Sequence, residues 1–196
     1  MNDLLLYEDV RCHYFKKPGP ENTGAVLKAV SQRAKELDID RVLIATRTGE
    51  TAFDALEIFR PDIKVIAVTH YTGFTEPDSQ EMAEESRQEL ESKGVNVLTC
   101  THAFGGIGRG IREKLSTYQV DEIIAHTLRM FGQGVKVAVE LALMAADAGK
   151  VRTDKDVISI GGTAKGADTA LVLKPANSAR IFSLKVREII CKPSMI

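Results

Sequence analysis

Short, continuous apolar runs alternate along this chain with longer segments of helical periodicity. The segments 42–45 and 64–69 predict strands that are buried on both faces, and the segments 95–100 and 156–160 predict a third and a fourth strand. Between them, apolar residues recur every three or four positions and predict helices, for example over 23–37, 52–59 and 119–131. Helices that alternate with strands through short links predict a three-layer α/β/α fold with a mostly parallel sheet.

The pattern near the carboxyl end adds a long helix and a fifth strand. Residues 135–141 alternate as a strand would, but the apolar run up to Gly149 favours one helix that ends at this glycine. On that helix Lys136 and Glu140 are four residues apart, so we expect them to pair on its surface. Residues 169–173 follow the fourth strand too closely for a crossover helix, which predicts an antiparallel return strand.

The remaining segments are less regular. Residues 76–93 hold seven acidic and two basic side chains and predict a solvated helix over the sheet. Segments 4–7 and 12–15 are each candidates for a short strand, and residues 181–186 alternate as an edge strand would. We expect a single domain over 1–196, with an N-terminal extension over 1–19 and a C-terminal extension over 176–196.

A polar turn links the first buried strand to the next helix. It reads Thr46-Arg47-Thr48-Gly49-Glu50-Thr51, and the glycine permits a backbone conformation that a Cβ atom would disfavour. Free N–H groups and a positive dipole end are expected where the helix begins, and together with the hydroxyls and the guanidinium they suit a phosphate. Alternatively, Thr48 or Thr51 only caps its own helix.

Other polar and aromatic loops are expected at the same edge of the sheet, because the carboxyl ends of parallel strands meet there and ligands bind there. These loops cover 70–75, 101–106 and 161–168, and the helices that begin near Asn22 and Gln133 return to the same edge. The candidate cofactor-binding residues are Asn22, Thr23, Thr46, Arg47, Thr48, Gly49, Glu50, Thr51, His70, Tyr71, Thr72, Gly73, Phe74, His102, Ala103, Phe104, Gln133, Gly161, Gly162, Thr163, Ala164, Asp168 and Thr169.

Several of these candidates also have a purely structural interpretation. Asn22 and Thr23 are suited to cap their own helix, and Asp168 is suited to an ordinary turn before the return strand. Tyr71, Phe74 and Phe104 either flank a ligand ring or cap the core. His70 and His102 either pair on a metal ion or donate to a ring, and without a placed carboxylate the metal is the weaker hypothesis.

Two further patterns do not define a catalytic site. The glycines over 105–110 lack the G-x-G-x-x-G spacing of a dinucleotide site and predict a loop that enters a helix over 111–115. No Ser-His-Asp or Cys-His order is evident, so catalytic residues stay unassigned.

Composition excludes several classes of protein. With 26 basic and 27 acidic residues, a net charge of −1 and no basic block, nucleic acid is not expected as a partner. Three scattered cysteines without a CxxC pair indicate neither a zinc knuckle nor a disulfide framework and favour a reducing compartment. No apolar run is long enough to span a membrane and no signal-peptide pattern is present, so we expect a soluble cytoplasmic protein.

The turn residues and two following segments also carry a resemblance. Thr46 to Ala52, Arg60-Pro61 and the strand Val65 to Thr69 resemble the carboxyl-terminal α/β domain of pyruvate kinase over roughly residues 20–175. The resemblance implies strand order 3-2-1-4-5 with the last strand antiparallel, and a phosphate on the turn 46–51. It does not extend to the catalytic barrel, so we expect no kinase activity. Glu50 stands where the activator-binding turn commonly has Arg, which disfavours a bisphosphate.

A closer likeness is to standalone archaeal and bacterial proteins of this fold that have no established activity. It rests on Lys17-Pro18-Gly19, Glu21-Asn22-Thr23, His70 with Gly73-Phe74, and the segments 145–149 and 166–170. This likeness implies bound flavin mononucleotide (FMN), with its phosphate on the turn 46–51, and a flavin-dependent redox role. The alternative is a regulatory module that senses a phosphorylated metabolite; a homo-oligomer stays open.

Overall fold

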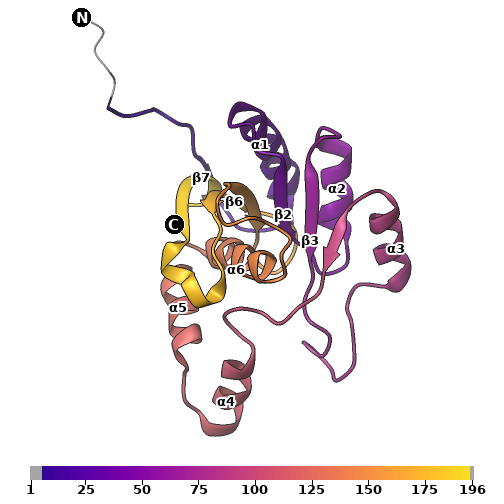
Figure 1. Cartoon of the computed structure of the whole chain (residues 1–196), viewed down its shortest axis with the longest axis vertical. Coiled ribbons are helices and arrows are strands. Elements are labelled where there is room, and N and C mark those ends of the chain that lie inside the picture. Colours follow the sequence, from indigo (N-terminus) through magenta and orange to yellow (C-terminus); the bar gives the residue numbers. More distant parts are fainter. Residues whose placement is uncertain (1–5, 195–196) are drawn as a thin grey trace, which may run out of the picture.

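Seven strands form one twisted sheet in the computed structural model, which describes residues 6–194 (Figure 1). The strands are β1 (His13–Phe15), β2 (Arg41–Ala45), β3 (Lys64–Val68), β4 (Asn96–Leu98), β5 (Val157–Gly161), β6 (Thr169–Lys174) and β7 (Lys185–Pro193). The helices are α1 (Thr23–Glu36), α2 (Glu50–Ile58), α3 (Glu84–Ser92), α4 (Ile107–Leu115), α5 (Val120–Arg129) and α6 (Gln133–Asp147), with two short 3-10 helices at Pro20–Asn22 and Ser178–Ser183.

Five contiguous strands, from β6 to the edge strand β4, confirm the predicted topology. In the order β1-β7-β6-β5-β2-β3-β4, the strands β5, β2, β3 and β4 are parallel to one another. Strand β6 runs antiparallel to β5, which is the order 3-2-1-4-5 with the last strand reversed. Strand formation here follows from the apolar runs, since β2 and β3 are buried on both faces.

The two terminal extensions enlarge this sheet from five strands to seven. Strand β7 pairs antiparallel with β6, and β1 pairs parallel with β7. The predicted strand at 12–15 is confirmed as His13–Phe15, but the predicted edge strand at 181–186 is wrong: Ser178–Ser183 is a 3-10 helix, and the strand that follows is not at the edge. The predicted strand at 4–7 lies partly outside the described residues; Leu6 and Tyr7 are exposed in a bend.

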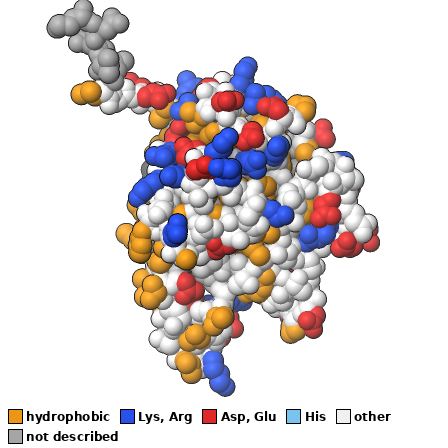
Figure 2. All heavy atoms as spheres, in the orientation of Figure 1, with side chains coloured by type: hydrophobic (Ala, Val, Ile, Leu, Met, Phe, Trp, Pro, Cys, Tyr) orange, Lys and Arg blue, Asp and Glu red, His pale blue; other side chains and the backbone are white. Residues whose placement is uncertain are grey.

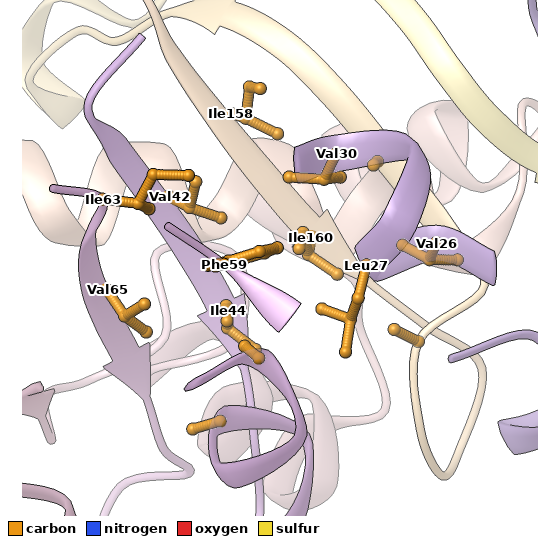
Figure 3. Packing of buried hydrophobic residues seen from close by; sticks show 14 of the residues in the cluster. Val26, Leu27, Val30, Val42, Ile44, Phe59, Ile63, Val65, Ile158 and Ile160 are labelled. Carbon is orange, nitrogen blue, oxygen red and sulfur yellow. The ribbon is translucent and has the colours of Figure 1, made fainter. Parts of the chain in front are cut away.

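Two helix layers cover the sheet, and alternate strand residues face alternate layers. In β2, Val42 and Ile44 pack with Val30 and other residues of α1 and α2, as Figure 3 shows, whereas Leu43 packs on the side of α5 and α6. Each fully buried Leu or Ile side chain contributes roughly 1.5–3 kcal/mol relative to an exposed one. The core is therefore split by the sheet into two apolar clusters.

Helix α6 lies against the centre of one sheet face, which confirms the helical interpretation of 135–149. A Cβ atom at Gly161 of β5 would lie 2.3 Å from the carbonyl oxygen of Gly134, so glycine allows the two backbones to approach this closely. The helix is covered almost all round, and Lys136 and Glu140 are 7% and 4% exposed. The expectation that this pair lies on the surface is therefore wrong.

The helix in the acidic segment is shorter than predicted, and the helix in the glycine-rich segment begins earlier than predicted. Residues 76–83 are irregular before α3, and α4 already begins at Ile107, so Gly108 and Gly110 lie inside it. At Gly108 a Cβ atom would lie 2.4 Å from the carboxylate of Asp121, which shows that α4 and α5 pack closely there.

Apolar side chains are exposed over α4 and α5, including Ile107 and Val120 (Figure 2). No helix within residues 6–194 has the length and apolar character needed to cross a membrane.

Candidate functional site

A cavity of about 670 Å³ lies at the carboxyl ends of β2, β3 and β5, between these strands and helices α4 to α6. Its position agrees with the edge at which ligands bind in parallel sheets. Twelve of the candidate residues line it: Thr46, Arg47, Thr48, Glu50, Thr51, His70, Phe74, His102, Phe104, Gln133, Gly162 and Ala164. The other candidates do not line it: Asn22, Thr23, Gly49, Tyr71, Thr72, Gly73, Ala103, Gly161, Thr163, Asp168 and Thr169.

The turn between β2 and α2 presents backbone N–H groups at one side of the cavity. Gly49 has a left-handed conformation with φ +105°, and its N–H donates to Thr46 Oγ1 at 3.0 Å. Neither Thr48 nor Thr51 caps α2 through its side chain. Within residues 6–194, no acceptor takes the N–H groups of Arg47, Thr48, Glu50 or Thr51. The capping interpretation of the threonines therefore has no support, and donors stay free where the helix dipole is positive.

Four rings pack together on the loops that follow β3 and β4. His70 and Phe74 lie with ring centroids 4.0 Å apart, and His102 lies 5.3 Å from Phe74 and 5.1 Å from Tyr71. The ring of His70 is held by Glu81, whose Oε2 lies 2.5 Å from His70 Nδ1. Glu81 Oε1 also lies 3.6 Å from Arg47 Nε, so a single carboxylate connects the ring cluster to the turn 46–51.

His102 is kept neutral at the base of the cavity. Burial lowers the pKa of His102 to about 4; Glu140 opposes this shift, whereas His70, Lys136 and Arg109 reinforce it. A neutral imidazole has one donor and one acceptor nitrogen, so at neutral pH His102 is able to donate to, or accept from, a polar group of a ligand. Burial also raises the pKa of the Cys100 thiol, which disfavours a thiolate nucleophile there.

A buried ion pair forms the floor of the cavity on α6. Lys136 donates to Glu140 Oε2, while Glu140 Oε1 accepts the backbone N–H of Phe104 at 2.8 Å. This arrangement ties the loop after β4 to α6 and leaves Phe104 buried, with its ring centroid 5.8 Å from Lys136 Nζ. Phe104 is therefore part of the core as well as of the cavity wall.

Arginines of α4 and α5 also line the cavity and were missed by the sequence analysis. Arg109 and Arg112 come from α4 and Arg129 from the last turn of α5. Arg109 lies over the ring of Phe74, with its Cζ 4.8 Å from the centroid. The sequence analysis placed Arg109 in a loop before a helix over 111–115, whereas α4 already begins at Ile107 and includes it. The side of the sheet that this helix faces was also unknown.

The candidates outside the cavity stabilise the surrounding loops. Asp168 is fully buried; its Oδ2 accepts the N–H of Thr163 at 3.1 Å, and its Oδ1 accepts the hydroxyl of Thr169 at 2.8 Å. Thr23 Oγ1 accepts the N–H of Ala167 at 3.0 Å, and the side chain of Asn22 donates to backbone carbonyls before α1. These residues hold the turn after β5 against the start of α1.

Metal ligation was the alternative for His70 and His102. Their ring centroids are 5.4 Å apart in an edge-to-face arrangement. Over the part of the chain that the structure describes, no three His, Cys, Asp or Glu side chains are grouped so as to hold a metal ion.

Comparison with known proteins shows which domain this chain is similar to. The family model described as pyruvate kinase, alpha/beta domain, matches residues 24–173. Among solved structures, a pyruvate kinase from Cryptosporidium parvum aligns with 72% of this chain at 16% sequence identity and a TM-score of 0.37. The alignment covers 20% of that protein, so the present chain spans about a fifth of its length.

Proposed function

The chain belongs to the family of the pyruvate kinase alpha/beta domain, and on that premise we propose that its cavity binds a phosphorylated small molecule. The phosphate lies on the turn 46–51 in this proposal. The observation that carries it is the group of four N–H donors that have no acceptor within residues 6–194, on a turn whose residues line the cavity. Thr46, Thr48 and Thr51 add hydroxyls, and Arg47 adds a positive charge.

We propose FMN as the ligand. At about 670 Å³ the cavity has the size of sites for ligands much larger than a phosphate. His70, Phe74 and His102 offer aromatic surface and hydrogen-bonding groups for a flavin ring, and Glu50 disfavours a second phosphate beside the first. A bound flavin would supply the redox chemistry, while the protein would position it and set the surrounding charge.

A regulatory module that senses a phosphorylated metabolite is the second candidate. It is favoured by the charged side chains of the cavity, which is lined by six Arg and Lys and four Glu residues. This is more charge than an uncharged ring requires. In either case, the family model that matches is that of the alpha/beta domain and not of the catalytic barrel, so we expect no turnover of phosphoenolpyruvate by this chain alone. A coupled assay with an authentic pyruvate kinase as positive control tests that expectation.

The visible absorption spectrum of the freshly purified protein is the first test, because an oxidised flavin that copurifies has absorption bands in the blue and in the near ultraviolet. The second is a fluorescence titration of ligand-free protein with FMN, riboflavin and flavin adenine dinucleotide. We expect riboflavin to bind at least about tenfold more weakly than FMN, because it lacks the charge-assisted phosphate contacts. Equal affinity for riboflavin would contradict the phosphate site. If no flavin binds and a sugar phosphate does, the sensor is the correct function.

A further inference from the structure

A second, smaller cavity of about 230 Å³ lies beside the first, between α4 and α5. The two cavities share four lining residues: Phe104, Arg112, Glu122 and Arg129. Because the same side chains form the wall of both, they adjoin at this place. A ligand that occupies the larger cavity would therefore lie directly beside the smaller cavity.

Hydrogen bonds from the Nε atoms fix the orientation of the two shared arginine side chains. Arg112 donates from Nε to Glu122 Oε1 at 2.6 Å, and Arg129 donates from Nε to Gln133 Oε1 at 2.7 Å. In the described part of the chain, neither guanidinium forms a hydrogen bond through its terminal nitrogens. Each side chain is thus held in position, and its two terminal guanidinium nitrogens are left available to donate to an oxyanion.

The charge of this junction is positive. Glu122 is 7% exposed, and its two oxygens are already engaged by Arg112 and by the N–H of Gln119. Among the residues from 6 to 194, Arg129 has only a neutral hydrogen-bond partner, Gln133, and no carboxylate there is in direct contact to balance its charge. A purely structural pair would account for Arg112 and Glu122, but it gives no role to a second arginine beside them.

We propose that Arg112 and Arg129 form an oxyanion subsite that binds the acidic group at the far end of the ligand. The inference rests on the proposed phosphate site at the turn 46–51 and deepens it: the ligand class is a phosphorylated compound with a second acidic group. A reduced flavin, whose ring is an anion at neutral pH, belongs to this class, as does a phosphorylated carboxylic acid.

Inorganic phosphate is the probe for the two ends separately. Protein labelled with ¹⁵N is titrated while the backbone signals of the turn 46–51 and the Nε–H signals of Arg112 and Arg129 are followed. We expect both groups of signals to shift, each with its own dissociation constant. Arg129→Gln should weaken the second site at least tenfold and leave the first unchanged, and Arg129→Lys should weaken it less because it retains the charge.

The outcomes separate this inference from the proposed function. Shifts at the turn alone would overturn the subsite and leave the phosphate site intact. Shifts at the arginines alone would overturn the phosphate site, and the ligand class with it. An unchanged second site in Arg129→Gln would overturn the subsite, and Lys114→Gln serves as the control because it also removes one positive charge, on α4, from a residue that lines neither cavity.

A second experiment tests whether one ligand reaches both ends. Alkyl phosphates of increasing chain length are compared with ω-carboxyalkyl phosphates of the same length. We expect one length at which the terminal carboxylate improves affinity at least tenfold, because the second contact becomes intramolecular. Arg129→Gln should abolish that gain. Equal affinity of the matched compounds at every length would overturn the claim.

Discussion

The two sides of the cavity are built from different parts of the chain. On the β2 side, donors belong to the backbone of one continuous turn, and Gly49 sets its conformation. On the α4–α6 side, the charged groups are long side chains from three helices, and each is held by a neighbouring carboxylate or amide. The first side depends on local sequence, whereas the second depends on how the helices are rotated against the sheet.

Because of this difference, the two sides of the cavity should tolerate substitutions differently. A backbone site keeps its N–H groups when the side chains around it are replaced, so each replacement removes only that side chain's share of the affinity and leaves the fold intact. A side-chain site depends on every partner that orients it, and buried partners also contribute to folding. Substitutions on the α4–α6 side should therefore change stability first, and substitutions in the turn should change affinity first.

The largest effect is expected for the buried pair on α6. Glu140→Ala leaves Lys136 buried without its partner and frees the N–H of Phe104, so we expect a loss of about 3–5 kcal/mol in the free energy of unfolding. Glu140→Gln should cost less, since the amide oxygen still accepts a hydrogen bond. Urea denaturation at pH 7 measures both variants, and a loss below about 1 kcal/mol for Glu140→Ala would place the pair outside the folding core.

The next effect is the pH dependence produced by His102. Its pKa of about 4 in the folded chain is below the usual value of about 6.5. Between these values the unfolded chain binds more protons, so stability falls as the pH decreases from about 6.5 to 4 and is fully retained above 6.5. The expected loss is about 3 kcal/mol. Stability curves for the wild type and His102→Asn check this, since the variant should lack this component of the slope.

In the turn, the expected effect is on affinity and not on stability. Arg47→Ala and Thr48→Ala should each weaken FMN binding by roughly 1.5–3 kcal/mol, the range for hydrogen bonds to a charged group. Thermal unfolding should stay close to that of the wild type, and Thr48→Ser should retain most of the affinity. If neither alanine variant changes the dissociation constant, the turn only begins its helix.

The smallest effect is expected at the rim of α4. Arg109 and Glu113 form an exposed pair four residues apart, with Arg109 Nε 3.0 Å from Glu113 Oε1. Such pairs contribute about 0.3–0.5 kcal/mol or less, so Arg109→Gln should barely change the urea midpoint. A loss above about 1 kcal/mol would show that Arg109 stabilises the fold through its contact with Phe74, and would extend the stability effect of the α4–α6 side to its exposed rim.

The sequence predicts the centre of the sheet because its information is local there. Unbroken apolar runs predict β2, β3 and β5, and the short link before β6 predicts its reversed direction. The outer strands were harder, because β1 pairs with β7, and residues such as His13 and Cys191 lie far apart in sequence. Alternation at 181–186 indicated a strand that begins four residues before β7 does, since alternation does not distinguish a 3-10 helix from the start of a strand.

The candidate site divides in the same way. The residues that line the cavity from the turn and the strand ends, such as Thr46, His70 and His102, were predicted from the position of loops at one edge of a parallel sheet. Arg112, Arg129 and Lys136 were not, because helical spacing does not show which face of a helix meets a cavity. Asp168 and Thr23 were placed in the site, whereas the structure engages them in loop contacts.

The two edges of the sheet have a consequence for the behaviour of concentrated protein. Both edge strands, β1 and β4, are three residues long. Lys16, Lys17 and Pro18 follow β1 directly, and lysine and proline both discourage a further strand from pairing. An edge this short offers another chain few backbone groups to pair with. The fold therefore resists growth into β-fibrils at both margins, although its centre consists of the aliphatic strands that such fibrils favour.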